Sequence, residues 1–187
     1  MVTVSTSKAY HHGDLRSALV SAGLTALETT AIGELSLRQL AREVGVSATA
    51  VYRHFPDKRA LLAALAEEGI ARLGDAQQLA SDQAGGGAAG FAATGRAYVR
   101  FALANPALFR LTFTHGDHAG SPTDSSDAPS RLLRSYSDQF GSGDAERLTL
   151  QAWAVAHGLA MLMLDGRLPH DDALIDRVLD TKTLFAA

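Results

Sequence analysis

Apolar residues recur every three or four positions through most of the chain, the period of an α-helix with one buried face. Leu37, Leu40, Ala41 and Val44, for example, fall at i, i+3, i+4 and i+7. No run of β-branched residues alternates with polar ones, as a half-buried strand would require. The pattern therefore predicts an all-α fold, with helices over residues 14–29, 37–44, 47–55, 58–81, 91–104, 106–113, 130–140, 144–165 and 171–184.

Two of the predicted helices are short and flank Gly45, which stands where a helix C-terminus needs positive φ. Ser36 is a good N-cap for the first of them, and Gln39 three residues on completes a Ser-x-x-Gln capping box. Ser47 caps the second. Two capped short helices around one glycine are the signature of a helix-turn-helix, whose second helix enters the DNA major groove. The sequence therefore predicts double-stranded DNA as a partner.

Two polar stretches interrupt the helical pattern in the second half of the chain. Residues 84–90, AGGGAAG, combine helix breakers and predict a loop. Residues 114–130, THGDHAGSPTDSSDAPS, are rich in Gly, Pro, Ser and Asp, and a loop of that length is either functional or disordered.

The predicted helix over residues 144–165 is apolar on two faces. Residues 148–164 carry no formally charged side chain and approach the length of a transmembrane helix. Thr149, Gln151 and His157 interrupt that stretch, so a buried helix in a bundle is the better interpretation. A helix that is apolar nearly all round must be buried on several sides, and in a domain this small we expect a second subunit to supply part of the burial. A homodimer also suits a helix-turn-helix protein, because two-fold symmetry lets two recognition helices read a palindromic site.

Composition divides the chain into two expected domains, a helix-turn-helix domain at 1–57 and a larger domain at 58–187, linked by the helix from residue 58. Hydrophobic residues are 47% of the sequence, enough for a folded core. The absence of cysteine excludes disulfides and thiolate metal sites and fits a cytoplasmic location. The N-terminus lacks the basic-then-apolar pattern of a signal peptide.

The distribution of charge agrees with a DNA-binding role for the first domain. The formal net charge of the whole chain is −3. Residues 1–60 hold seven Lys and Arg against five Asp and Glu, a balance of +2, whereas residues 61–187 hold ten against fifteen, a balance of −5. The positive charge therefore accompanies the helix-turn-helix. Because +2 is a modest balance, it supports the motif and could not establish DNA binding by itself.

The second helix of the motif offers few side chains for reading bases. Val51 and Phe55 should face the core, which leaves for the DNA side Ala48, Thr49, Ala50, Tyr52, Arg53 and His54. The guanidinium of Arg53 can bridge O6 and N7 of guanine, with a phosphate contact or solvent as the alternative. The threonine and alanine methyl groups can pack on thymine. No Asn or Gln is present to read adenine, so we expect specificity to depend on few direct contacts and on DNA shape.

Residues 10–75 closely resemble the DNA-binding region of TetR-family transcriptional regulators, through YHHGDLRSAL and LSLRQLAREVGVSATAVYRHFPDKRALLAAL. Further on, FALANPALFRLTF and WAVAHGLAML look like the ligand-binding domain with a Trp-x-x-x-His-Gly motif that is found in some of these regulators. The resemblance implies a homodimeric repressor. In such a protein a small-molecule effector bound among the C-terminal helices separates the recognition helices and releases DNA.

The resemblance also places Tyr52, His54 and Lys58 at positions that contact phosphate, and hydroxyl, imidazole and ammonium groups are suitable donors. An ordinary surface contact is the alternative for each. Lys8 adds charge attraction in an N-terminal arm or belongs to a solvated tail. The full set of candidate DNA contacts is Ser36, Arg38, Ser47, Ala48, Thr49, Ala50, Tyr52, Arg53, His54 and Lys58.

Trp153 and His157 lie one helical turn apart, so their side chains share a helix face. In one interpretation they line an effector pocket, with His157 as its polar anchor. In the other they belong to the core, with His157 bonded to a neighbouring helix and Gly158 allowing a close approach. The candidate ligand contacts are Tyr98, Phe101, Phe109, Phe113, Trp153, His157 and Met161.

Metal, cofactor and catalytic signatures are weak. The pairs His11-His12 and His115-x-x-His118 have no cysteine near them to complete a ligand set, so we expect no metal site and no cofactor. Neither a nucleophile elbow, a Gly-rich phosphate loop nor an HExxH pattern occurs, so we expect no enzyme. The sequence predicts a ligand-responsive repressor. The alternatives are a helical ligand- or partner-binding protein without useful DNA affinity, and an enzyme that uses His157.

Overall fold

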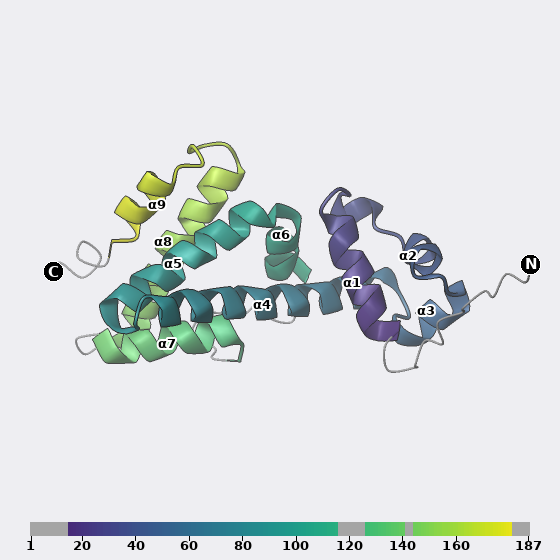
Figure 1. The fold of residues 1–187 in the computed structure, drawn as a ribbon, viewed down its shortest axis with the longest axis horizontal. Helices are drawn as coiled ribbons and strands as arrows, with labels where there is room; N and C mark the ends of the chain where they lie inside the picture. The colour runs from purple at the N-terminus through teal and green to yellow at the C-terminus, as the bar shows by residue number, and fades with distance from the viewer. Residues whose placement is uncertain (1–14, 116–125, 141–143, 181–187) are drawn as a thin grey trace, which may run out of the picture. The chain divides into compact units, whose positions relative to one another are not determined.

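The computed structural model describes residues 15–115, 126–140 and 144–180, and all regular secondary structure within these ranges is helical (Figure 1). The all-α prediction is confirmed. The described residues up to Leu61 form one compact unit and those from Leu62 onward form another.

The first unit packs three α-helices and a 3-10 helix around a small core. The elements are α1 (Leu15–Leu27), η1 (Ile32–Glu34), α2 (Leu37–Val44) and α3 (Ala48–His54), followed by the first turn of α4. Leu19, Leu40, Val51 and Phe55 are almost completely buried. The guanidinium carbon of Arg16 lies 5.4 Å from the centre of the Phe55 ring, a cation–π contact within the same unit.

The turn between α2 and α3 is set by local backbone interactions. Gly45 has φ 76°, a left-handed conformation that glycine adopts without strain, as predicted. Its N–H donates to the carbonyl of Arg42, and the N–H of Val46 donates to that of Ala41, the bonding of a Schellman motif. The hydroxyl of Ser47 accepts a bond from the N–H of Ala50, so the predicted cap of α3 is confirmed.

The predicted capping box at the start of α2 is wrong. Ser36 occupies the N-cap position with extended dihedral angles, but its side chain makes no capping hydrogen bond. The Gln39 amide instead donates to the carboxylate of Glu43 one turn further on, at 3.0 Å. The i, i+4 side-chain pair has therefore replaced the reciprocal bond to the backbone.

The second unit is a helical bundle in which α5 is central and packs against α6, α7, α8 and α9. The helices are α4 (Lys58–Gln83), α5 (Gly87–Ala104), α6 (Pro106–His115), α7 (Ala128–Phe140), α8 (Ala145–Leu164) and α9 (Asp172–Val178). Val99, Phe109, Met163 and Ile175 are among the fully buried side chains of its core. No helix in the described ranges is long and apolar enough to cross a membrane.

Helix α5 begins earlier than the sequence predicted. The loop expected over residues 84–90 is wrong beyond residue 86, because α5 starts at Gly87. Gly90 lies inside the helix and is buried. A Cβ added to it would come within 2.5 Å of the Tyr136 hydroxyl and 3.1 Å of Ser81 Oγ. This glycine allows a close approach of helices and does not break one.

The polar loop predicted over residues 114–130 is shorter at both ends in the structure, because α6 extends to His115 and α7 begins at Ala128. Asp127 Oδ1 accepts a bond from the N–H of Ser130 at 2.7 Å and so caps α7. The helix predicted over 171–184 ends at Val178, and the last part of that range lies outside the described residues.

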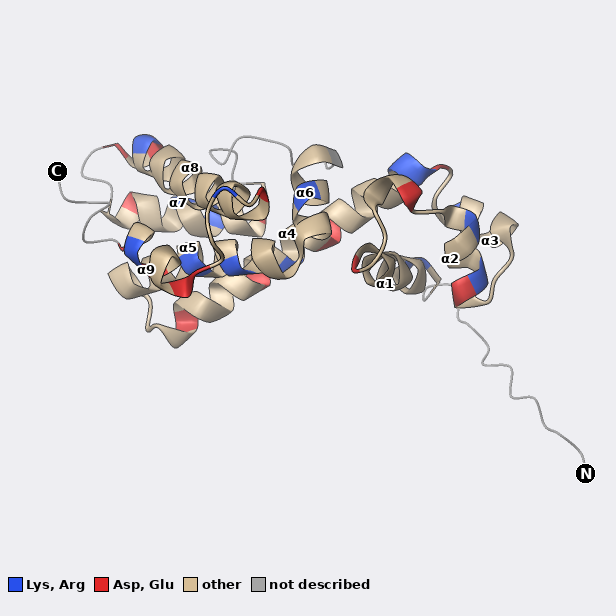
Figure 2. Cartoon of the chain, turned by 90° about the horizontal axis from the view of Figure 1, so that it is seen from above, with Lys and Arg blue, Asp and Glu red and all other residues tan. Residues whose placement is uncertain are grey.

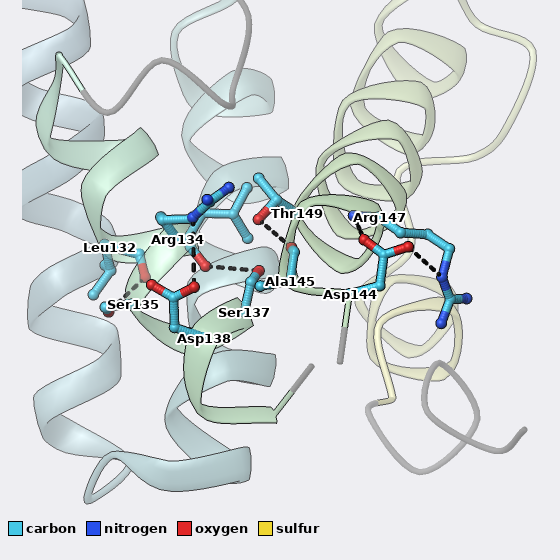
Figure 3. A network of polar contacts seen from close by, with 10 residues as sticks. Leu132, Arg134, Ser135, Ser137, Asp138, Asp144, Ala145, Arg147 and Thr149 are labelled. Carbon is cyan, nitrogen blue, oxygen red and sulfur yellow. Dashed lines mark hydrogen bonds and ion pairs between the residues drawn. The ribbon is translucent and has the colours of Figure 1, made fainter. Parts of the chain in front are cut away.

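Helices α7 and α8 pack together although both carry polar side chains at their contact (Figure 3). Ser137 and Thr149 are completely buried. Their hydroxyls donate to carbonyls one turn back, Ser137 to Leu133 and Thr149 to Ala145. Because each hydroxyl is satisfied within its own helix, the two helices approach without a buried unpaired donor.

Candidate functional site

Helix α3 has one buried face and one exposed face that carries polar side chains. Val51 and Phe55 are buried, as predicted; α3 packs against α2, and Arg16 of α1 lies over the Phe55 ring. The side chains of Thr49, Tyr52 and Arg53 are exposed, while those of Ala48, Ala50 and His54 are half-buried. Tyr52 is 44% exposed.

Neither Tyr52 nor Arg53 has a side-chain hydrogen bond or ion pair to any other described residue. The phenol hydroxyl and the guanidinium are therefore available as donors on one face of α3. A guanidinium in this position can donate to two acceptors at once, on a base edge or a phosphate. The exposed surface of this unit also carries Lys and Arg on α2, on α3 and in the first turn of α4 (Figure 2).

The N-terminus of α2 is open in the structure. The Ser36 hydroxyl makes no cap, so the first N–H groups of α2 lack a side-chain acceptor. Arg38, in the first turn of the same helix, is exposed. Uncapped N–H groups beside a cation suit a phosphate oxygen. Ser36 and Arg38 remain predicted DNA contacts, and the uncapped N–H groups and the exposed arginine support that prediction.

Lys58 has a structural role that the sequence did not suggest. Its ammonium donates to the carbonyl of Gly33 at 2.6 Å and so ties the start of α4 to η1. An ammonium has three donors, so two remain for a phosphate. The α4 N-terminus itself is occupied, because Asp57 Oδ1 accepts from the N–H of Ala60 at 2.8 Å. The phosphate contact expected at Lys58 would therefore use the ammonium, with one N–H of this helix end already bonded.

In the second unit, a cavity of about 60 Å³ lies between α4, α5, α7 and α8. Its lining includes Phe91, Tyr98, Phe113 and Trp153, which give it aromatic walls. The aliphatic part comes from Ile70, Leu73, Leu133 and Leu179. In its present form the cavity is smaller than the roughly 300–1,000 Å³ of typical ligand pockets.

Of the seven side chains predicted to contact a ligand, the cavity brings together Tyr98, Phe113 and Trp153. The other four, Phe101, Phe109, His157 and Met161, pack in or against the adjacent core and are not part of the lining. Phe109 is 1% exposed and stands edge-on to Tyr98, with the ring centres 5.4 Å apart.

His157 is held by two neighbours. Its Nδ1 lies 2.8 Å from the Tyr98 hydroxyl on α5, and the Trp153 ring stacks on its imidazole with centres 5.1 Å apart. Burial lowers the pKa of His157 and raises that of Tyr98, so the neutral imidazole and the protonated phenol are favoured. The bond to a neighbouring helix agrees with the core-packing interpretation of His157, whereas Trp153 lines the cavity.

The polar part of the cavity was missed by the sequence analysis. Gln77, Thr94, Asp127 and Ser130 all contribute to the lining. A signal was present for Gln77, because it follows Ile70 and Leu73 at helical spacing and is a polar residue on an apolar stripe. For Asp127 no signal was available, because it stands in a stretch that the sequence predicted only as loop.

One face of α8 is left uncovered by the described residues. Leu150, Ala154, Gly158 and Leu162 recur every four residues, and the two leucines are 42% and 47% exposed. A Cβ added to Gly158 would meet nothing within 4 Å. The close approach expected at Gly158 is therefore absent within the described part of the chain. This stripe, called the α8 face below, is apolar along about three turns.

No group of three or more His, Asp or Glu side chains in the described ranges is placed to hold a metal ion. The side chains of the two histidine pairs lie outside the described part of the chain.

Two family profiles match the sequence. One, "Bacterial regulatory proteins, tetR family", covers residues 19–65, and the other, "Tetracyclin repressor-like, C-terminal domain", covers residues 91–182. Together they span both compact units. Among curated proteins, none is significantly similar to the chain.

Several solved structures are similar over nearly the whole chain. A protein of unknown function from Rhodococcus sp. RHA1 is 38% identical, with 95% of this chain and 97% of that chain covered and a TM-score of 0.77. A TetR variant from Acinetobacter baumannii AYE, in complex with minocycline, is 21% identical over 91% and 93% of the chains, with a TM-score of 0.63. NalD, the secondary repressor of the MexAB-OprM multidrug efflux pump in Pseudomonas aeruginosa, is 17% identical over 92% and 95%, with a TM-score of 0.53. The last two likenesses show a shared fold.

Proposed function

The chain belongs to the TetR family of transcriptional regulators, and we propose that it is a ligand-responsive repressor that binds palindromic operator DNA as a homodimer. The N-terminal helix-turn-helix would bind DNA, and the C-terminal bundle would dimerise and bind the effector. The observation that carries this proposal is the face of α3, where Tyr52 and Arg53 stand exposed beside buried Val51 and Phe55.

The α3 face has the features of a recognition helix. The helix is short, capped by Ser47 and fixed by two buried side chains, so its outward residues keep one orientation. Arg53 supports direct reading of a guanine, and Tyr52, His54 and Lys58 support phosphate contacts that hold the register. The half-buried Ala48 and Ala50 offer only methyl groups, so we infer that DNA shape adds to specificity.

The proposal of a homodimer is supported by the α8 face. A soluble monomer would expose this apolar stripe to water, whereas a two-fold copy packed against it would bury both leucines. Gly158, with open space over its Cα, would permit close approach of the partner's helix. Two recognition helices related by the same axis would then face two half-sites of a palindrome.

Effector control is supported by the cavity and by the continuity of α4. Ile70, Leu73 and Gln77 of α4 line the cavity, and the same helix begins at Lys58, which is bonded to Gly33. An effector that enlarges the cavity would displace α4, and we propose that this displacement changes the separation of the recognition helices. Such an effector must bind the two conformations with different affinity. The Trp153-x-x-x-His157-Gly158 motif is consistent with the WHG type of C-terminal domain.

Binding to DNA from the region upstream of the protein's own gene tests the proposal directly. We expect a specific complex at low salt that persists at physiological salt and weakens linearly in log affinity against log salt concentration. Arg53→Ala should weaken binding and relax the preference at one base position, because the guanidinium reads one base pair. The matched control is Arg167→Ala, an exposed arginine in the second unit, which should bind as the wild type does.

Failure to bind DNA at either salt concentration would contradict the repressor proposal. It would favour the alternative of a helical ligand-binding protein without useful DNA affinity, which the modest positive balance of residues 1–60 leaves open. Equal losses in Arg53→Ala and Arg167→Ala would show that only overall charge matters. That result would contradict the role assigned to α3.

A further inference from the structure

The Gln77 side chain is buried in the cavity wall with half of its amide bonded. Gln77 is 7% exposed, and its Nε2 donates to the carbonyl of Thr94 at 3.2 Å. That bond fixes the orientation of the amide, because the reversed side chain would place two oxygens against each other. Oε1 is left buried with no hydrogen-bond partner among the described residues. A buried amide oxygen without a donor is uncommon and unfavourable in folded proteins.

The charge of the lining is negative. Among the described lining residues Asp127 is the only carboxylate, and none is Lys or Arg. The nearest arginine along α5, Arg96, forms an ion pair with Asp176 at 2.6 Å, so its charge is already compensated. An anion in this cavity would be desolvated beside a carboxylate and would find no described cation to pair with.

The remaining walls are apolar and aromatic. A ring or aliphatic chain can pack between Phe91, Phe113 and Trp153, whose faces also attract a positive charge. The Tyr98 hydroxyl already pairs with His157, and the Thr94 hydroxyl donates to the Phe91 carbonyl at 2.7 Å. The lining polar atom that is buried without a hydrogen-bond partner among the described residues is an acceptor, Gln77 Oε1.

We propose that the effector is a mostly apolar small molecule that carries a hydrogen-bond donor and no negative charge. Its donor forms a hydrogen bond with Gln77 Oε1, and its apolar part packs between the aromatic walls. A cationic group on the ligand would face Asp127. The inference rests on the proposed effector site and adds the chemical class of its ligand. Since the cavity has about 60 Å³, a ligand of one ring must push the walls apart, which couples binding to movement of α4.

Four one-ring probes of similar size separate the features of this ligand class. Benzyl alcohol and benzylamine carry donors, toluene carries none, and benzoate carries a negative charge. Binding to the full-length protein at millimolar concentration would be followed by ligand-observed NMR and by the shift in thermal unfolding temperature. We expect benzyl alcohol and benzylamine to bind about threefold to tenfold more tightly than toluene, the gain that one hydrogen bond allows. Benzoate should bind most weakly.

Variants locate the interaction. Gln77→Met keeps the length of the side chain and removes the acceptor, so benzyl alcohol should lose about threefold to tenfold in affinity while toluene does not. The matched control is Gln78→Met, the adjacent exposed glutamine whose amide bonds Asp82, which should change nothing. Asp127→Asn keeps the capping oxygen and removes the charge, so benzylamine should weaken and benzoate should gain.

Several results would overturn the inference. Benzoate binding as tightly as benzyl alcohol would contradict the charge argument. Equal binding of toluene and benzyl alcohol, unchanged in Gln77→Met, would show that solvent satisfies Oε1. Binding of no probe would remove both this inference and the proposed effector site. A protein that binds DNA but prefers benzoate would keep the repressor proposal and lose only the ligand class, whereas donor preference without DNA binding would do the reverse.

Discussion

The hydroxyl of Tyr98 on α5 lies 2.8 Å from Nδ1 of His157 on α8, and this bond joins the two helices that form the centre of the second unit. Burial keeps the Tyr98 phenol protonated and the His157 imidazole neutral, so this hydrogen bond joins two uncharged groups. Phe113 and Trp153 pack around the imidazole, with ring centres 5.1 Å from it in both cases.

Removal of the Tyr98 hydroxyl should destabilise the second unit. Tyr98→Phe keeps the ring and its packing but leaves Nδ1 of His157 without its hydrogen-bond partner. We expect the free energy of unfolding to fall by about 1–2 kcal/mol, as for other partly buried hydrogen bonds. Urea unfolding followed by circular dichroism measures the change, with Tyr52→Phe as the exposed control. A loss as large in the control would contradict the role of this bond.

The stability of the protein should decrease on acidification, partly through His157. Because burial lowers the pKa of His157 in the folded state, the unfolded chain binds more protons there as the pH falls below about 6.5. The contribution of the neutral imidazole is complete above that pH and is lost as the pH falls through the folded-state pKa. Urea unfolding at several pH values should show a shallower dependence in His157→Gln. The same dependence in both proteins would contradict this assignment.

The two N-cap serines of the helix-turn-helix should differ in their contribution to stability. Ser47→Ala removes the bond to the N–H of Ala50 and should lower the free energy of unfolding by about 1 kcal/mol. Ser36→Ala removes a hydroxyl that makes no cap and should change it by less than about 0.5 kcal/mol. Thermal or urea unfolding of the two variants decides the matter. Equal losses would mean that Ser36 caps α2 in solution.

Lys58 should contribute to both stability and DNA affinity. Lys58→Ala removes the bond to the Gly33 carbonyl and should lower the free energy of unfolding by about 0.5–1.5 kcal/mol. It should also weaken binding to all DNA sequences alike and reduce the slope against salt by about one phosphate contact. Arg59→Ala, at the next and exposed position, is the control for stability. A stability loss with unchanged DNA affinity would mean that Lys58 only bonds the Gly33 carbonyl and does not contact DNA.

Charges placed on the α8 face should separate the proposed dimer. Leu150→Arg combined with Leu162→Arg would bury two cations against their symmetry mates, so sedimentation should show a monomer. Affinity for a palindromic operator should fall with it. The control is Leu79→Arg, a leucine on α4 that is 59% exposed. A dimer that persists in the double variant, or that is lost in the control, would place the interface elsewhere.

Local interactions explain why the helix-turn-helix could be predicted from the sequence. Gly45, Ser47, Val51 and Phe55 lie where the pattern of caps and apolar spacing placed them, because each feature depends on neighbours within about one helical turn. The same kind of pattern misjudged Ser36, whose hydroxyl makes no cap, and Gln39, whose side chain bonds Glu43 in place of the backbone N–H of Ser36.

The sequence by itself determined the helical class and the position of the helix-turn-helix, since hydrophobic period and capping are properties of short segments. Only the tertiary structure decided that His157 forms a hydrogen bond with Tyr98 and that Tyr136 approaches Gly90 closely. It also decided that Gln77 and Asp127 line one cavity. The partners in each of these contacts are far apart in the sequence. Their contacts follow from how the helices of the bundle pack, and no local spacing encodes that arrangement.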